Sequence, residues 1–184
     1  MPTLILASNS PRRRELLTEL GYEFTVKPSM FEEQLRGLSA HDTALAFARG
    51  KAAEVFSRYP HAVVLGADTV VALDNMILGK PRDSEDAERM LRLLSGRVHS
   101  VFTGVCIADA NGRAERVVET KVLFKTLSES LIKEYVLSGT PLDKAGAYGI
   151  QDGIVVESID GSYSNVMGLP TEAVKEMLHL KERV

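Results

Sequence analysis

The chain has 184 residues, of which 45% are hydrophobic and 26% charged. This length corresponds to one domain or at most two small lobes, and the composition is that of a globular protein rather than a disordered one. Lysine and arginine number 22 against 25 aspartate and glutamate residues, a net charge of -3. This balance excludes the strongly basic surface that long nucleic acids or anionic membranes require, so any bound anion is expected to be small.

The single cysteine and the N-terminal segment predict a cytoplasmic protein. Cys106 cannot form an intramolecular disulfide, and its place in an apolar, strand-like run favours a small core residue over a nucleophile. An apolar run precedes the arginines at 12–14, which reverses the charge order of a signal peptide. The longest apolar stretch, residues 62–73, is too short to span a bilayer and contains Asp68.

The first half of the chain predicts alternating strands and helices. Residues 3–7 are expected to form a buried strand, and Ser10-Pro11 is a strong helix start, with serine as N-cap and proline at the first helical position. That helix is expected to end at Gly21. The same criteria predict a helix over 39–57, a buried strand over 63–67, a hairpin of 70–73 and 76–78 around Asp74-Asn75, and a helix over 84–94.

The second half predicts a long hairpin followed by shorter elements. Alternating apolar residues from Val101 predict a strand that ends before Asn111-Gly112, with a return strand over 116–124. A helix over 128–136, two short strands around Asp160-Gly161 and a helix over 170–180 complete the series. Because helices and strands interleave without a repeat or linker, we expect one α/β domain over residues 1–184. Its mixed, partly antiparallel sheet is flanked by helices and opens a cleft.

Three consecutive arginines occupy the first turn of the first predicted helix. The helix dipole disfavours cations there by about 0.3 to 1 kcal/mol each, so Arg12, Arg13 and Arg14 indicate that an anion offsets their charge. Free backbone N–H groups, the hydroxyls of Ser8 and Ser10, and the guanidinium groups would together bind phosphate. A solvated basic turn explains the same residues, since no P-loop or GxGxxG motif accompanies them.

Asp68 is a carboxylate in the middle of an apolar run. Such a group must be paired, protonated, metal-bound or placed at a strand end facing a cleft. A two-residue loop at Asp74-Asn75 would set Thr69 opposite Lys80, and so bring Lys80 close to Asp68. In that ideal register Lys80 points to the other face of the sheet, and only a bulge or a longer loop would turn both toward one site.

Other polar residues have two interpretations each. Glu32 and Glu33 lie in a polar connector and are either solvated or, if they reach the cleft of Asp68, part of an oxygen-ligand site for a cation such as Mg²⁺. Lys51 is explained equally by a surface position with a buried stem. Gln151 ends a glycine-containing loop that is either a connector or a ligand-binding segment. Its amide could pair with the N3–H and carbonyl of thymine or uracil.

Seven blocks of sequence resemble the Maf proteins, which are nucleoside triphosphate pyrophosphatases also described as septum-formation inhibitors. The blocks are LILASNSPRRRELL, ARGKA around Lys51, GADTVV around Asp68, GKPRD around Lys80, SGRVHSVFTGV, PLDKAGAYGIQ and SYSNVMGLP. They run in order from Leu4 to Pro170, nearly the whole chain. The resemblance implies a nucleotide-binding cleft and cleavage between the α and β phosphates, dependent on Mg²⁺ or Mn²⁺.

The resemblance also implies roles for individual residues. Asp68 matches the general base, although direct metal ligation fits the sequence equally well. Glu33, and less securely Glu32, matches an acidic residue at the metal end. The cations that match phosphate contacts are Arg12, Arg13, Lys51 and Lys80. The positions that match base choice in the dTTP/UTP branch are Arg12, Thr69 and Gln151.

The sequence leaves two classes of function open. One is a house-cleaning pyrophosphatase for dTTP, UTP and modified pyrimidine nucleotides; the other is a nucleotide-sensing regulator of septum formation. The acids at Glu32, Glu33 and Asp68 favour the enzyme, because a sensor needs cations for phosphate but has little use for a base. Nucleic acid is not an expected partner. The sequence does not set the oligomeric state, and a homodimer is compatible with it.

Overall fold

The computed structural model describes residues 3–34 and 37–182 as an α/β fold around one sheet. The strands of this sheet are β1 (Leu4–Leu6), β2 (Phe24–Val26), β3 (Val63–Leu73), β4 (Met76–Leu78), β5 (Val98–Asp109), β6 (Gly112–Phe124) and β7 (Val156–Asp160). The α-helices are α1 (Pro11–Glu19), α2 (Ala40–Arg58), α3 (Ser84–Leu94), α4 (Glu129–Leu137), α5 (Tyr163–Met167) and α6 (Thr171–Glu182). Short 3₁₀ turns η1 (Thr140–Asp143), η2 (Ala145–Ala147) and η3 (Ile150–Asp152) follow α4.

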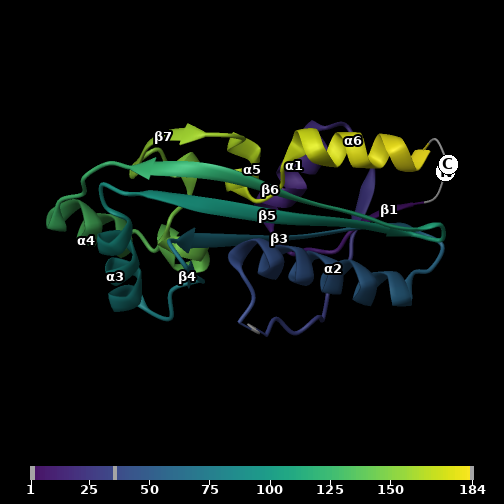
Figure 1. Cartoon of the computed structure of the whole chain (residues 1–184), viewed down its shortest axis with the longest axis horizontal. Coiled ribbons are helices and arrows are strands. Elements are labelled where there is room, and N and C mark those ends of the chain that lie inside the picture. Colours follow the sequence, from purple (N-terminus) through teal and green to yellow (C-terminus); the bar gives the residue numbers. More distant parts are fainter. Residues whose placement is uncertain (1–2, 35–36, 183–184) are drawn as a thin grey trace.

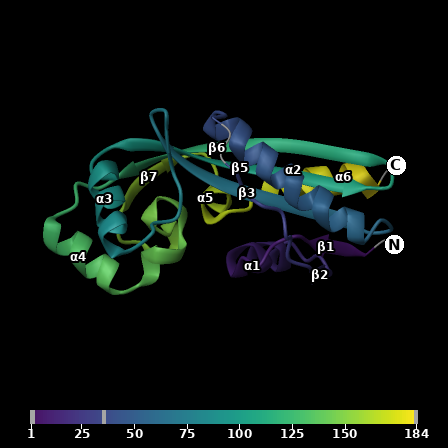
Figure 2. The same cartoon turned by 90° about the horizontal axis from the view of Figure 1, so that it is seen from below.

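The sheet is mixed, as the sequence predicts. Its order is β2-β1-β3-β5-β6-β7, with β4 paired to β3. β1 pairs in parallel with β2 and β3, while the β3, β5, β6 and β7 neighbours are antiparallel. Helix α2 covers one face, and α1, α5 and α6 lie on the opposite face (Figure 1). Helices α3 and α4 group at one end of the sheet (Figure 2).

Three apolar clusters stabilise these layers. Alanine and valine side chains of α2 pack on β1, β3 and β5, while leucines of α1 and the apolar side of α6 pack on the other face of the same strands. A third cluster joins α3, α4 and the far ends of β3, β5 and β6. None of the described helices is both long and apolar enough to cross a membrane.

Most local signals in the sequence produce the predicted element. Ser10, Ser39 and Ser128 each cap a helix by accepting a hydrogen bond from the backbone N–H three residues on. The first hairpin pairs Leu73 with Met76, the predicted register. Cys106 is 1% exposed, and burial raises the pKa of its thiol to about 11, which confirms an unreactive core residue.

Three expectations are corrected. The strands predicted over 63–67 and 70–73 form one continuous strand, so Asp68 lies within β3 and not in a break between two strands. In the long hairpin Asp109 pairs with Gly112, so the turn is Ala110-Asn111, one residue earlier than predicted; the Asp109 carboxylate accepts the Asn111 N–H at 2.9 Å. Of the two short strands predicted around Asp160-Gly161, the second is instead helix α5, because the Ser162 hydroxyl caps that helix.

His99 is a buried polar residue of β5. It is 2% exposed and packs edge-on against the rings of Phe124 and Tyr148. Its Nε2 lies 2.8 Å from the Tyr148 hydroxyl. Burial lowers the pKa of His99 to about 4, so the ring is neutral at physiological pH.

Two glycines allow α2 to lie unusually close to the sheet. A Cβ atom on Gly66 would come within 2.4 Å of the Ala48 carbonyl oxygen, and one on Gly104 within 2.3 Å of the Ala44 carbonyl oxygen. These neighbours are helix backbone, which cannot move aside as a side chain does. The close approach places Lys51, one turn beyond Ala48, beside Asp68.

We expect Gly66→Ala to destabilise the protein by about 1 to 3 kcal/mol, because the added methyl group forces α2 away from β3. Urea denaturation measures this loss. Gly79→Ala is the matched control, since a Cβ on Gly79 meets no atom within 4 Å. Equal denaturation midpoints for the two variants would contradict the close-packing argument.

Candidate active site

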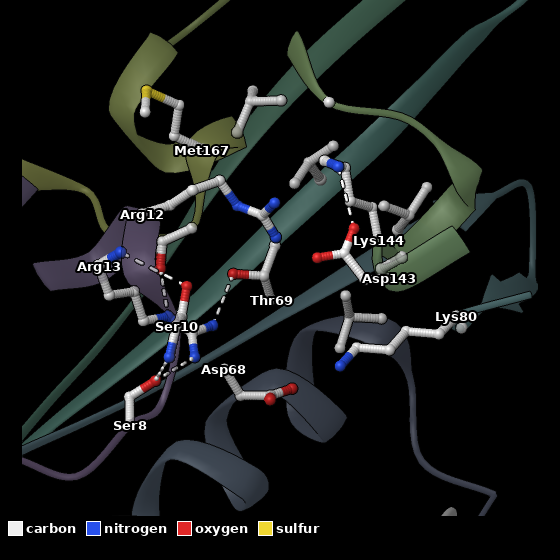
Figure 3. Close-up of a pocket in the computed structure, with 18 of the residues that line it drawn as sticks. Ser8, Ser10, Arg12, Arg13, Asp68, Thr69, Lys80, Asp143, Lys144 and Met167 are labelled. Atoms are coloured by element: carbon white, nitrogen blue, oxygen red, sulfur yellow. Dashed lines mark hydrogen bonds and ion pairs between the residues drawn. The ribbon is translucent and has the colours of Figure 1, made fainter. Parts of the chain in front are cut away.

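A cavity of about 730 Å³ opens at the ends of β1 and β4 and along the middle of β3. Its wall includes Ser8, Ser10, Asp68, Thr69 and Gln151, so the start of the first helix, the buried aspartate and the loop that ends at Gln151 meet at one cavity. Figure 3 shows Ser8, Ser10, Asp68 and Thr69 around one hollow. The charged side chains of the lining are Arg12, Arg13, Glu33, Lys51, Asp68, Lys80, Asp143 and Lys144.

The first two arginines of α1 differ in their contacts. Arg13 donates hydrogen bonds to the Gly168 carbonyl at 2.7 Å, the Thr69 hydroxyl at 3.1 Å and the Ser8 hydroxyl at 3.3 Å. It thus ties α1 to β3 and to the end of α5. Arg12 extends into the cavity (Figure 3) and makes no hydrogen bond or ion pair with the residues that the structure describes. Arg12 is therefore the α1 cation available to a ligand.

Of the alternatives that the sequence leaves open for Asp68, pairing is present, and its partner is Lys51. The Lys51 ammonium lies 2.6 Å from Asp68 Oδ1 and 2.6 Å from Glu33 Oε1. The Asp68 and Lys51 side chains are 11% and 14% exposed, whereas Glu33 is 48% exposed. Two carboxylates thus share one ammonium group, and the positive charge of Arg13 also acts on both of them.

Burial dominates the electrostatics of Asp68. It raises the pKa of the carboxyl group above its ordinary value, and the neighbouring charges of Lys51 and Arg13 oppose that rise. A raised pKa makes Asp68 a stronger base than an exposed aspartate. The Lys51 contact holds the carboxylate in one orientation, which suits a group that must accept a proton at a defined place.

Lys80 reaches the same cavity by a route that the ideal hairpin register does not give. The β3–β4 pairing ends at Val71 and Leu78, so Thr69 has no partner on β4. Beyond it, the Gly79 carbonyl accepts a hydrogen bond from the Gly146 N–H at 3.0 Å. Figure 3 shows the Lys80 side chain directed into the cavity, on the side of Asp68. The departure from strand geometry after Leu78 therefore allows both residues to face one site.

The loop that carries Gln151 is held by Tyr135 of α4. The Tyr135 hydroxyl accepts the Gly149 N–H at 3.1 Å and donates to the Asp152 carboxylate at 2.5 Å, so it contacts the residues on both sides of the Ile150-Gln151 pair. Gln151 is exposed, and its amide has no hydrogen-bond partner in the described part of the chain. The loop is fixed while the amide stays available.

The predicted acidic pair separates in the structure. Glu33 lines the cavity, whereas Glu32 is exposed and is not part of the lining. Within residues 3–34 and 37–182, no group of three or more histidine, cysteine, aspartate or glutamate side chains is arranged to hold a metal ion. Of the acidic residues that the sequence singles out, Asp68 and Glu33 line the cavity, and Asp143 is the third carboxylate of the lining.

Sequence reasoning missed two charged residues of the cavity. Lys144 is 7% exposed, and its ammonium contacts the Thr140 carbonyl and, at 2.9 Å, the Asp143 carboxylate. Both lie within PLDKAGAYGIQ, where only Gln151 was assigned a role. The charge pair within an otherwise apolar and glycine-rich loop was the available signal.

The fold and the site together define an α/β protein with a cationic cavity around a buried carboxylate. A family model described as Maf-like protein matches residues 3–180. A dTTP/UTP pyrophosphatase of Thermococcus onnurineus (strain NA1) is 49% identical over 179 residues, covering 96% of this chain and 97% of that protein. Proteins of the same description from Salmonella typhimurium (strain LT2) and Geobacillus sp. (strain WCH70) are 49% and 46% identical, covering 97% and 98% of this chain and 92% and 99% of their own lengths. The chain belongs to the Maf family.

We expect Asp68→Asn to leave the free energy of unfolding at pH 7 unchanged or higher. The pKa of Asp68 is raised in the folded state, so its contribution to stability is complete below the unfolded pKa and is lost as the pH rises through the folded pKa. At pH 7 the ionised group therefore costs stability. Asn removes that charge, and Lys51 keeps Glu33 as a partner.

Urea denaturation at pH 7 tests this expectation, and Asp86→Asn is a control of opposite sign. Hydrogen bonds from Arg82 and Arg89 hold the pKa of Asp86 far below its usual value, so its ionised form stabilises the fold and the variant should lose stability. A loss in Asp68→Asn as large as in Asp86→Asn would show that the Asp68 carboxylate is instead a stabilising group.

Proposed function

We propose that this protein hydrolyses dTTP and UTP to the nucleoside monophosphate and pyrophosphate. The observation that supports this most directly is a buried, lysine-paired aspartate at the wall of a cavity with five cationic and three acidic side chains. A nucleoside triphosphate supplies the anion that such a cavity requires. The relatives named above are described as dTTP/UTP pyrophosphatases, which supports the same reaction.

In the proposed reaction, water breaks the anhydride bond between the α and β phosphates. Asp68 accepts the proton of that water, and Lys51 keeps the carboxylate oriented. The negative charge that grows on the departing pyrophosphate is offset by Arg12 and Lys80. The positive charges of Arg13 and Lys51, which line the same cavity, add to this effect. Ser8 and Ser10, at the start of α1, bind phosphate through their hydroxyls.

A divalent cation, Mg²⁺ or Mn²⁺, fits the donor set of this cavity. Asp68 and Glu33 offer carboxylate oxygens close enough to share the Lys51 ammonium, and these hard cations prefer oxygen ligands completed by substrate phosphates and water. We propose that these two residues hold the ion, while Glu32 lies outside the cavity wall. The ion would neutralise phosphate charge. Asp68 as base and Asp68 as ligand are both consistent with this arrangement.

We assign base recognition to Arg12, Thr69 and Gln151, which line the same cavity. Gln151 offers both a donor and an acceptor, the pair that the edge of uracil or thymine requires. The biological role that we propose is removal of dTTP, UTP and modified pyrimidine nucleotides in the cytoplasm.

Pyrophosphate release from a panel of nucleoside triphosphates, with Mg²⁺ or Mn²⁺ added, tests this function. We expect dTTP and UTP to be hydrolysed with the highest kcat/KM, because a site that hydrogen-bonds one base edge leaves its own polar groups unpaired against another. Gln151→Ala should reduce this preference more than it reduces the best rate. Equal turnover of dTTP and GTP by the unmodified protein would contradict the proposed base recognition.

Lys80→Ala should lower kcat about 10²-fold or more with little effect on stability, since the side chain is exposed and directed into the cavity (Figure 3). Arg14→Ala is the matched control. Arg14, near the start of α1, is an exposed cation like Lys80, but it is not part of the cavity wall. Steady-state kinetics on dTTP measure both variants. Wild-type turnover in Lys80→Ala would remove Lys80 from the site.

Asp68→Asn separates the two roles of Asp68 when Mn²⁺ is titrated against nucleotide binding and pyrophosphate release. A general base usually contributes about 10² to 10⁴-fold, so loss of turnover with retained metal-assisted binding indicates the base. Loss of both, with partial recovery at high Mn²⁺, indicates a metal ligand. Unchanged turnover at every metal concentration would refute both roles and favour a nucleotide sensor.

A further inference from the structure

The hydroxyl of Thr69 is part of a buried chain of hydrogen bonds that runs away from the cavity. Thr69 lies opposite Thr103 in the β3–β5 pairing, and their hydroxyl oxygens are 3.0 Å apart. The Thr103 hydroxyl donates to the backbone carbonyl of Asn165 at 3.0 Å. Thr103 and Asn165 are both completely buried. Thr69 itself is half-buried and lines the cavity.

The direction of each hydrogen bond in this chain follows from the number of protons available. A hydroxyl carries one proton, and Thr103 gives its proton to a carbonyl that can only accept. The Thr69–Thr103 contact therefore uses the proton of Thr69. Arg13, which can only donate, occupies one lone pair of Thr69 at 3.1 Å. Thr69 is left with one lone pair and no proton for a ligand.

The far end of the chain is fixed by further contacts. The Asn165 side-chain amide donates to the Val101 carbonyl at 3.1 Å and to the Thr120 hydroxyl at 3.0 Å. These bonds hold Asn165 between β5 and β6, so its carbonyl stays in place to receive the Thr103 proton. The same carbonyl also accepts the Gly168 N–H at 3.0 Å, and a carbonyl has no proton of its own to offer Thr103. A reversal of the chain would turn the Thr103 proton toward Thr69 and leave the Thr103 and Asn165 oxygens 3.0 Å apart with no proton between them, which is unfavourable.

We propose that Thr103 is a specificity-determining positioning residue, which makes Thr69 a hydrogen-bond acceptor only and so selects pyrimidines that carry a hydrogen on N3. This inference rests on the proposed function and extends it. Uracil and thymine have an N3–H donor, which in this proposal lies between two acceptors, the Gln151 amide oxygen and the remaining lone pair of Thr69. N3 of cytosine is an acceptor that would face the same lone pair of Thr69. The cavity therefore discriminates against cytosine nucleotides at this contact.

Gln151 cannot make this discrimination by itself. Its amide has no partner among the described residues, and rotation by half a turn exchanges its donor and acceptor. Such a group suits the edge of uracil or of cytosine equally. A group that can only accept, or only donate, is needed to separate the two bases. Thr69 can only accept from a ligand, because Thr103 donates its proton to the Asn165 carbonyl and therefore takes the proton of Thr69.

The experiment compares kcat/KM for UTP and CTP in the wild-type protein and in Thr103→Val. Valine keeps the shape of the side chain but frees the proton of Thr69, which can then turn toward N3 of cytosine. We expect the UTP to CTP ratio to fall by about tenfold, the size of one net hydrogen bond. A purely structural defect would lower both rates and leave the ratio unchanged. Thr103→Ser, which retains the hydroxyl, should keep the wild-type ratio.

Thr120→Val is the matched control. It removes a completely buried hydroxyl from the same network on the far side of Asn165, without touching Thr69. Its ratio should stay at the wild-type value. An unchanged ratio in Thr103→Val, or an equal fall in Thr120→Val, would overturn the proposal. If Thr103→Val does not fold, Thr103→Ala is measured in its place with the same expectation.

Binding of non-hydrolysable UTP and CTP analogues, measured by calorimetry on the same variants, distinguishes this inference from the proposed function. If the protein releases no pyrophosphate but binds the UTP analogue more tightly, and Thr103→Val loses that preference, the pyrophosphatase function fails and the role of Thr103 stands. If the wild-type protein shows no preference for UTP over CTP in either assay, the role of Thr103 is refuted whatever its activity.

Discussion

The contact between Asp68 and Lys51 is the interaction on which the rest of the site depends. A carboxylate inside an apolar strand is unfavourable without a counter-charge, and the counter-charge comes from a helix on the face of the sheet. That helix approaches closely enough because Gly66 and Gly104 have no side chain beneath it. The packing of α2 and the electrostatics of the cavity are therefore one constraint, met by two glycines and one lysine.

The cations of the cavity divide into those held by the protein and those left available. The cations held by the protein are Arg13, Lys51 and Lys144, each of which contacts more than one acceptor. Arg13 joins α1 to the sheet and Lys51 joins α2 to the sheet, whereas Lys144 contacts acceptors within its own 140–152 segment. Arg12 and Lys80 reach into the cavity without such partners among the described residues. This division separates cations that shape the cavity from cations that can bind phosphate, and it explains how so much positive charge is tolerated in one place.

Local signals predicted most of the elements because their causes are local. A capping serine, a proline at the first helical position and a two-residue turn each act within a few residues, and the starts of α1, α2 and α4 follow from them. The departures from the predicted elements have local causes too: the Ser162 hydroxyl caps helix α5 where the sequence pattern predicts a strand. The turn of the long hairpin falls at Ala110-Asn111, because the Asp109 carboxylate accepts the Asn111 N–H and so fixes the turn one residue earlier than the Asn-Gly pair predicts.

The sequence by itself determined the fold class, the family resemblance and the set of candidate residues, since motifs such as GADTVV and PLDKAGAYGIQ are contiguous and their residue types restrict the chemistry. Only the tertiary structure decided which candidates meet. It joined Lys51 to Asp68 and Glu33, left Glu32 outside, and turned Lys80 into the cavity. It also set the direction of the hydrogen bonds behind Thr69, because that direction depends on a carbonyl 62 residues away from Thr103. Pattern and propensity act along the chain, whereas charge pairing and proton order depend on groups that only folding brings together.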